Sequence, residues 1–396
     1  MRRAALKLLD AVLRRGQPLE AALASATQGL ERSDDRGLAH AIAASVLRWL
    51  PDLDALIDSA TKKALPHDAK ARFVLRIALA QALLLETPGH AAIATVLPLV
   101  DGGPRKLVHG VFGTLIRKGV TLPETPHLPD AVFLRWQAAW GDDAVAAARA
   151  GLAAPPPIDI TLKDVAWAEK LGGECPREGH VRLPAGTRIA ELPGYAEGGW
   201  WVQDIAAARP AEMLGAGHGR TVLDLCAAPG GKTMQLASAG WKVTAVDASE
   251  TRMKRVAENL KRTELTAEIV VADALFYSPG RQFDAVLVDA PCSATGIWRR
   301  HPDVLHRARP GVIRSLAEQQ QAILARAAQA VKPGGTLVYA VCSLEPEEGE
   351  RNAAWFAASH AGFTAGETVR NRPGDDGDGF FVATFHRKDE PLSASA

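Results

Sequence analysis

The stretch that most constrains this sequence is TVLDLCAAPGGKT, from Thr221 to Thr233. A short apolar run ends at Asp224, a turn of small residues follows, and helix-compatible residues come next. This order is typical of a first parallel strand leading into a ligand-binding loop, because ligands of open α/β sheets lie beyond the carboxyl ends of the strands. Gly230 and Gly231 would let the backbone approach a ligand that a Cβ would exclude.

Other glycine loops fit this stretch less well. A Walker loop needs a glycine where Cys226 stands, so the GGKT ending is a partial match. The adjacent glycines lack the G-x-G-x-x-G spacing of dinucleotide-binding proteins, which disfavours a nucleotide-dependent oxidoreductase. A plain tight turn is the remaining alternative. The next predicted strand, Lys242 to Val246, leads to Asp247, which is placed to bind ribose hydroxyls. The pattern favours a nucleoside ligand without a pyrophosphate, such as S-adenosylmethionine.

The length and charge distribution point to several domains, one of them basic. A chain of 396 residues exceeds a single core, and 47% hydrophobic with 23% charged residues is ordinary for a globular protein. The net charge is only +1, but residues 1–125 carry 17 Lys and Arg against 12 Asp and Glu, a local excess of +5. A second basic cluster comprises Arg299, Arg300, His301, Arg307, Arg309 and Arg314. Each cluster is either a phosphate-binding surface or an ordinary solvated face.

Cysteine usage indicates a reducing compartment. The four cysteines are Cys175, Cys226, Cys292 and Cys342. They form no C-x-x-C pair, so neither a zinc site nor a redox pair is indicated, and we expect no metal. The opening residues lack the apolar core of a signal peptide, and no stretch has the length of an uninterrupted membrane span. We therefore expect a cytoplasmic protein without a membrane partner.

Periodicity divides the chain into a helical part and an α/β part. Residues 1–122 read as helices, residues 123–157 as a Pro-rich helical linker, and residues 158–215 as short strands mixed with loops. An aromatic stripe in the linker, Phe133, Trp136 and Trp140, is expected to lie in a core. From residue 216 to 388, strands alternate with helices, which predicts a parallel, doubly wound sheet. Residues 389–396 form a polar tail that we expect to be loose.

The predicted elements of the α/β part can be placed by residue range. After Lys242–Val246, strands are expected at Ile269–Val271, Ala285–Val288 and Thr336–Val341, and a further strand at GFFVATFHR. Helices are expected at Glu250–Lys261 and Gly311–Val331.

Reactive side chains follow the predicted strands. Asp273 comes after one strand, Asp289 and Cys292 after the next, and Cys342 after another. A single cysteine of this kind is usually a small buried hydrophobe. Two cysteines beyond neighbouring strand ends, on the side of the ligand loop, indicate chemistry, as do the acids, because buried carboxylates need partners.

The motifs LDLCAAPGGKT, DAPCSATGIWRRHPD, YAVCSLEPEE, DGFFVA and WWVQD resemble those of the bacterial RNA (cytosine-5-)-methyltransferases of the Sun (Fmu) family, RsmB type. The resemblance covers almost the whole chain. It implies an all-α NusB-like RNA-binding bundle, then an α/β class I (Rossmann-like) methyltransferase domain that binds S-adenosylmethionine and carries a small α+β RNA-recognition extension. The implied boundaries are 1–122, 123–157, 158–215 and 216–388.

The resemblance also implies roles for single residues. Cys342 would be the thiolate that adds to carbon 6 of cytosine, and Cys292 would help to expel it. Asp289 would hydrogen-bond the ring, and Lys232 would favour the thiolate electrostatically. The implied cofactor-binding residues are Cys226, Ala227, Ala228, Pro229, Gly230, Gly231, Lys232, Asp247, Arg252, Asp273 and Asp289.

The expected substrate is small-subunit (16S) rRNA, and a monomer is expected. Val341 stands where the family usually has threonine before its nucleophile, which removes no catalytic group. Two alternatives stay open: the same chemistry on transfer RNA, and a NusB-like RNA-binding or assembly factor with an inactive methylase domain.

Overall fold

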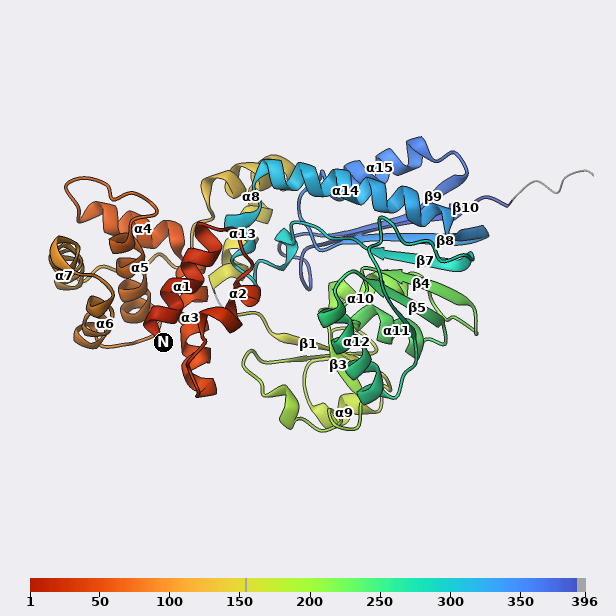
Figure 1. Ribbon diagram of the computed structural model, residues 1–396, viewed down its shortest axis with the longest axis horizontal. Coiled ribbons are helices and arrows are strands. Elements are labelled where there is room, and N and C mark those ends of the chain that lie inside the picture. Colours follow the sequence, from red (N-terminus) through yellow and green to blue (C-terminus); the bar gives the residue numbers. More distant parts are fainter. Residues whose placement is uncertain (154, 390–396) are drawn as a thin grey trace, which may run out of the picture. The chain divides into compact units, whose positions relative to one another are not determined.

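The computed structural model describes residues 1–153 and 155–389 (Figure 1). It divides into two compact units. The helical unit comprises residues 1–155 together with 298–309, and the sheet unit comprises residues 156–297 and the chain from Pro310 onward. The predicted loose tail, 389–396, lies outside the described residues except for Asp389.

The helical unit is built as the periodicity predicted, without strands in its described part. Its helices are α1 (Arg2–Leu13), α2 (Leu19–Ala26), α3 (Ser33–Arg48), α4 (Leu50–Ser59), α5 (Lys70–Leu83), α6 (Gly89–Val96), α7 (Gly102–Arg117), α8 (Asp130–Ala153) and α13 (Val304–Arg307). The apolar stripe of α1 packs inward through Ala5, Leu8, Leu9 and Val12. Pro51 lies in the first turn of α4, where its missing N–H has no helical partner to lose.

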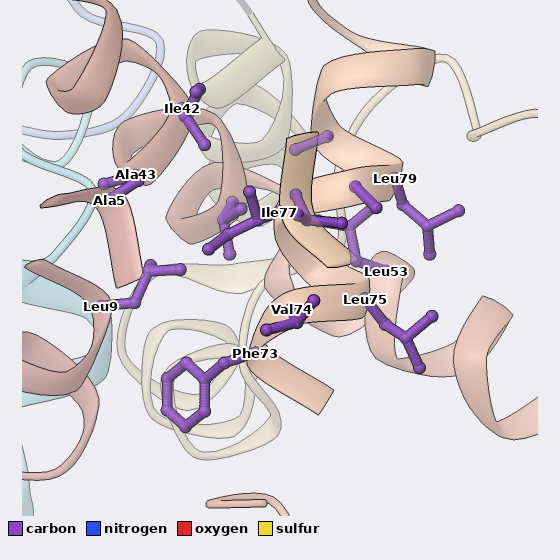
Figure 2. Close-up of a cluster of buried hydrophobic side chains, with 14 of the residues drawn as sticks. Ala5, Leu9, Ile42, Ala43, Leu53, Phe73, Val74, Leu75, Ile77 and Leu79 are labelled. Carbon is purple, nitrogen blue, oxygen red and sulfur yellow. The ribbon is translucent and has the colours of Figure 1, made fainter. Parts of the chain in front are cut away.

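Helix α5 is the central helix of this unit, as its all-round apolar pattern predicted. Figure 2 shows Phe73, Val74, Leu75, Ile77 and Leu79 of α5 among buried side chains of the neighbouring helices. These α5 residues are at most 3% exposed. A helix that is apolar on every side is stable in water only when other helices surround it.

The aromatic stripe in α8 is only partly core. Trp136 is buried, whereas Phe133 and Trp140 are half-buried. Gly141 interrupts the helix with φ 82°, a conformation that favours glycine. The Pro-rich loop before α8 is held by Asp52, whose carboxylate accepts the His127 N–H at 2.9 Å.

The sheet unit begins with a small antiparallel sheet, a region to which periodicity had assigned no fold. Its strands are β1 (Ile158–Leu162), β2 (His180–Leu183) and β3 (Trp200–Val202), in the order β2-β1-β3, with α9 (Trp167–Leu171) beside them. Trp200 is fully buried in the core of this subdomain with Ile160, Leu171, Val181 and Leu183.

A seven-stranded sheet forms the centre of the unit, in the order β6-β5-β4-β7-β8-β10-β9. Its strands are β4 (Thr221–Leu225), β5 (Lys242–Asp247), β6 (Glu268–Val271), β7 (Phe283–Asp289), β8 (Val331–Val341), β9 (Phe363–Asn371) and β10 (Phe380–Arg387). Strands β6, β5, β4, β7 and β8 pair in parallel. Strand β10 pairs antiparallel with both of its neighbours, β8 and β9, a feature that the alternation of strands and helices did not predict.

Helices cover both faces of this sheet (Figure 1). One face packs on α14 (Pro310–Gln329) and α15 (Glu350–Ser359), and the other on α10 (Ile205–Glu212), α11 (Gly231–Ser238) and α12 (Glu250–Thr263). Alternate residues of β4 pack into the hydrophobic cores on the two faces of the sheet. Leu223 and Leu225 face α14, and Val222 faces α11 and α12. The predicted helix ending at Val331 was two residues too long, since Val331 pairs with Phe283 as the first residue of β8.

Candidate active site

The loop between β4 and α11 has the backbone that a close-approaching ligand requires. Cys226 has φ 61° and Gly230 has φ 102°. A Cβ on Gly230 would lie 3.2 Å from a methyl of Val256 in α12, so glycine also permits close packing behind the loop. The Ala228 N–H donates to Asp247 Oδ2 at 3.2 Å, which joins this loop to the end of β5.

Arg252 contacts both this loop and Asp247. Its guanidinium donates to the Ala228 carbonyl and lies 3.5 Å from Asp247 Oδ2. Asp247 is 5% exposed, and its second oxygen accepts the Ser249 N–H at 2.9 Å. The carboxylate at the end of β5 is therefore rigidly oriented. Asp273, beyond β6, is exposed, and its carboxylate accepts the Leu275 N–H at 2.9 Å.

Asp224 carries a buried acceptor that nothing in the described chain satisfies. Thr233 donates to Asp224 Oδ2 at 2.6 Å, whereas Oδ1 has no hydrogen-bond partner among the described residues. Burial raises the pKa of Asp224 to about 7, an effect that the Thr233 hydrogen bond only partly offsets. The acids Asp224, Asp247, Asp273 and Asp289 with the glycine turn form an acceptor-rich edge. This donor and acceptor set fits a ligand that offers ribose hydroxyls and amino groups.

Cys226 lies at this edge but is not activated. Burial, and then the negative charges of Asp289, Asp247 and Asp224, raise the pKa of its thiol to about 12. A thiol of this kind stays protonated and unreactive at neutral pH. Ala227 and Ala228, with Pro229, complete the turn.

Cys292 and Cys342 are brought together. Their Sγ atoms are 3.5 Å apart, one beyond the end of β7 and the other beyond β8. This is the arrangement that neighbouring parallel strands impose on residues following their carboxyl ends. The pKa of Cys292 is raised well above its ordinary value by its hydrogen bond with Cys342 and by burial.

Lys232 and Asp289 form an ion pair at the same edge. Lys232 Nζ is 2.7 Å from Asp289 Oδ2, and the Lys232 side chain is 11% exposed. Burial alone would lower the pKa of Lys232, but the Asp289 carboxylate outweighs burial and the net shift is upward. Cys342 also acts on this ammonium, since a negative charge on its sulfur favours the protonated lysine.

The two cysteine loops are joined by short-range contacts. The Gly296 N–H donates to the Cys342 carbonyl at 3.0 Å, and the Leu344 N–H donates to Thr295 Oγ1 at 3.0 Å. Gly379 donates in turn to the Gly296 carbonyl at 2.9 Å. The sequence motifs contained these residues, but nothing in their spacing indicated that they bind one another.

Glu348 was missed by sequence reasoning. It is fully buried and accepts hydrogen bonds from Ser293 and Ser343, the residues that follow the two cysteines. In the sequence it lies in the acidic run EPEEGE, which reads as a solvated loop. The available signal was its place as the last residue of the motif YAVCSLEPEE, shortly after Cys342.

The second basic cluster is built partly into the helical unit. Arg307 pairs with Asp303 at 3.3 Å and donates to the Gly16 carbonyl at 2.9 Å. Arg309 and Arg314 are exposed. The prediction that this cluster holds phosphates therefore stays open for the exposed residues, whereas Arg307 has a structural role.

The comparisons with known proteins agree with this geometry. The model of the 16S rRNA methyltransferase RsmB/F family matches residues 211–386, and that of the NusB family matches residues 1–112. Ribosomal RNA small subunit methyltransferase B of Cronobacter sakazakii is 34% identical, with 98% of this chain and 99% of that protein covered. The corresponding protein of Klebsiella pneumoniae is 35% identical, with 98% of both covered.

Solved structures share the fold. The crystal structure of PH0851 covers 98% of this chain and 99% of its own, with a TM-score of 0.75 and 24% identity. NSun6 from Pyrococcus horikoshii, solved with SFG, covers 66% of this chain and 99% of its own, with a TM-score of 0.60 and 18% identity. The predicted NusB-like bundle followed by a methyltransferase fold is thus confirmed. In the described residues, no helix has the length and apolarity that crossing a membrane requires. By sequence and by fold, the chain belongs to the family of ribosomal RNA small subunit methyltransferase B.

Proposed function

We propose that this protein transfers the methyl group of S-adenosylmethionine to carbon 5 of a cytosine in 16S rRNA. The observation that carries the proposal is the contact of 3.5 Å between Cys292 Sγ and Cys342 Sγ at the ligand-binding edge of the sheet. Two thiols at one position allow one sulfur to bond the base while the other hydrogen-bonds that sulfur as it leaves.

The chemistry requires a covalent step on the base, because carbon 5 of cytosine is a poor nucleophile. The Cys342 thiolate adds to carbon 6, and the electron pair of the C5–C6 double bond becomes available at carbon 5. S-adenosylmethionine, when bound, supplies an electrophilic methyl group. The proton on carbon 5 then leaves to water and the C6–S bond breaks, which restores the aromatic ring. The Cys292 S–H, which lies against the Cys342 sulfur, would stabilise the departing thiolate by a hydrogen bond.

Asp289 and Lys232 would stabilise the base during this step. The Asp289 side chain is 30% exposed, so its carboxylate can accept a hydrogen bond from the amino group of a cytosine, or from N3 once N3 carries a proton. The Lys232 ammonium lies 2.7 Å from Asp289 Oδ2 and partly neutralises the charge of that carboxylate. The same ammonium lies within electrostatic reach of Cys342. A preorganised ion pair of this kind needs little reorganisation as charge develops on the ring.

The acceptor-rich edge would hold the cofactor. Asp247 would accept the ribose hydroxyls, Asp273 would accept the adenine amino group, and the turn of residues 226–231 would allow close backbone approach; the hydrogen bonds that hold both acids support these roles. Arg252 would act indirectly, by fixing Asp247 and the Ala228 carbonyl. The unsatisfied Asp224 Oδ1 supports a polar ligand or an ordered water at this place.

The helical unit and the small antiparallel sheet would bind RNA. The excess of basic residues in 1–125 supports phosphate binding, which predicts that affinity falls as salt rises. The cytosine must be unstacked to reach the cysteines, so the target is expected in a loop or a locally opened helix.

The decisive experiment incubates the full-length protein with S-adenosylmethionine and unmodified small-subunit rRNA, with transfer RNA in parallel. Methylated nucleosides are quantified by mass spectrometry. The proposal expects 5-methylcytosine in the rRNA only. 5-Methylcytosine in transfer RNA alone would keep the cysteine chemistry and overturn the substrate. Cofactor binding without methylation of either RNA would favour an inactive methylase domain.

The two cysteine roles separate by substitution. Cys342→Ala should abolish turnover, because no nucleophile adds to carbon 6. Cys292→Ala should leave protein covalently attached to RNA, visible as a slow band on a denaturing gel. A Cys292→Ala protein that turns over and leaves no such band would contradict the release role.

A further inference from the structure

We propose that Glu348 is a positioning residue for methyl transfer, whose buried carboxylate sets the distance between the two cysteine sulfurs by binding the loop that follows each. This inference rests on the proposed roles of Cys292 and Cys342. Glu348 lies beyond β8, between Cys342 and α15, and is fully buried.

The carboxylate bridges two loops from different strands. Its Oε1 accepts the main-chain N–H of Ser293 at 2.8 Å, and its Oε2 accepts the hydroxyls of Ser293 and Ser343, both at 2.5 Å. The two hydroxyl oxygens are themselves 3.2 Å apart. Ser293 directly follows Cys292 and Ser343 directly follows Cys342. The single Glu348 carboxylate therefore restrains both cysteines through the serine that follows each of them.

Further hydrogen bonds from α14 and β8 hold Glu348 itself in place. Gln320 in α14 donates to Glu348 Oε1 at 3.2 Å and to the Pro291 carbonyl at 2.9 Å. The Tyr339 hydroxyl contacts both the Glu348 carbonyl and Gln320 Oε1, the latter at 3.0 Å. Buried networks of this kind are rigid when every member is satisfied.

Burying a carboxylate with neutral donors is unfavourable, so a purely structural purpose would be served more cheaply by apolar residues. Burial raises the pKa of Glu348, an effect that the hydrogen bonds from Ser293, Ser343 and Gln320 only partly offset. The same carboxylate disfavours ionisation of Cys292, whereas the Lys232 ammonium lies in electrostatic reach of Cys342. The charged group that acts on Cys292 is thus an acid, whereas the charged group in reach of Cys342 is a lysine, and groups in different electrostatic environments can take different roles.

The test uses full-length protein in a Cys175→Ser background, because Cys175 is exposed and would cross-link between molecules. Glu348→Ala removes the bridge. Glu348→Gln keeps one acceptor oxygen, and its amide N–H can donate a hydrogen bond to the serine hydroxyls. Glu347→Ala is the matched control: Glu347 is the preceding residue, and among the described residues its carboxylate pairs at the surface with Arg351 at 3.0 Å.

The first readout is sulfur placement, measured without RNA. Diamide oxidises two adjacent thiols to a disulfide and takes up their two electrons and two protons, and the Cys292–Cys342 peptide is quantified by mass spectrometry. Disulfide formation needs defined geometry, so Glu348→Ala should slow it about tenfold. Glu348→Gln should slow it less, and Glu347→Ala should match the parent.

The second readout is turnover. We expect the kcat of Glu348→Ala to fall about a hundredfold while KM for RNA changes little, since misplacing a reacting atom affects the transition state most. Glu348→Gln should recover part of the lost kcat. In a double-mutant cycle, Ser343→Ala should add little to Glu348→Ala, because both substitutions remove the same contact.

Parent-like cross-linking and kcat in Glu348→Ala would overturn the proposal. If Glu348→Ala does not fold, the same two readouts are taken on Glu348→Gln and Ser343→Ala, and parent-like values there overturn it equally. The cross-linking readout stands even if no RNA is methylated. Slowed cross-linking in an inactive parent would uphold the positioning role and refute the proposed function.

Discussion

Lys232 Nζ lies 2.7 Å from Asp289 Oδ2, which joins the first turn of α11 to the last residue of β7. Burial disfavours the charged lysine, yet the carboxylate keeps the pKa of Lys232 above its ordinary value. The ammonium is therefore present throughout the neutral range. The pair places a fixed positive charge within electrostatic reach of Cys342.

Lys232→Met should lower kcat about a hundredfold, because it removes preorganised charge from the site and leaves Asp289 without its cation. The matched control is Lys332→Met. Lys332 forms a Lys–Asp pair of the same length, 2.7 Å, with Asp284 near the start of β7. Single-turnover kinetics on rRNA compares the two. Equal losses in both variants would show that the effect is structural and not specific to the site.

Asp224 should make stability depend on pH in the direction opposite to most acids. Its pKa is raised to about 7 by burial, against about 3.9 for an unfolded aspartate. Between these values the folded state holds a proton that the unfolded state has released, so folding weakens as pH rises through this window. Below it the contribution is complete, and above about pH 7 it is lost.

Asp224→Asn cannot titrate, so its free energy of unfolding relative to the wild type should improve as pH rises from 5 to 8, by on the order of a few kcal/mol. Urea unfolding at several pH values measures the difference. Asp284→Asn should behave oppositely. Lys332 and Thr221 outweigh the burial of Asp284 and lower its pKa, so its stabilisation is lost as pH falls. A pH-independent difference for Asp224→Asn would refute the raised pKa.

Gly296→Ala should disrupt the cysteine loops through sterics alone. A Cβ at Gly296 would lie 1.8 Å from the Gly379 carbonyl oxygen and 3.0 Å from that of Cys342. Neither is the end of a flexible side chain, so the loops must move apart, and kcat should fall about a hundredfold. At Gly311, in α14, a Cβ would meet nothing within 4 Å. Gly311→Ala should therefore keep full activity in the same assay, and similar losses in both variants would contradict the argument.

The site was predictable where it follows from strand topology. Parallel strands bring their carboxyl ends to one edge, so a sequence with Asp247, Asp289, Cys292 and Cys342 just after strands already places them together. The fold of the α/β part was predictable for the same reason, because strands and helices alternate with regular lengths.

What was not predictable depends on contacts between distant segments. Glu348 lies in an acidic run whose composition matches a solvated loop, and only the packing of α14 against β8 buries it. Strand β9 is largely polar and exposed, so it carries no apolar signal. Nor does the local sequence indicate that residues 298–309 pack in the helical unit, since the apolar residues of this segment would equally suit the methyltransferase fold.

That docked segment gives the final prediction. Trp298 is 2% exposed within the helical unit, its ring packs edge-on against Trp136 at 5.7 Å, and its Nε1 donates to the Ala148 carbonyl at 3.1 Å. Arg48 adds a second link, donating to the Arg299 carbonyl at 2.5 Å and to the Leu152 carbonyl at 3.1 Å. Residues 298–309 are therefore part of the helical core, although they follow β7 in the sequence.

Trp298→Ala should destabilise α8 by about 3–5 kcal/mol, because it leaves a large cavity and removes the hydrogen bond from Nε1 to the Ala148 carbonyl. Hydrogen exchange of the amides in residues 142–153 measures the effect, and faster exchange is expected there. Leu134→Ala, in the same helix but 62% exposed, is the control and should leave exchange unchanged. Unaltered exchange in Trp298→Ala would show that α8 does not depend on this segment. Faster exchange would mean that a fragment ending at Pro155 lacks part of its own core, so RNA binding by the helical unit must be measured with residues 298–309 present.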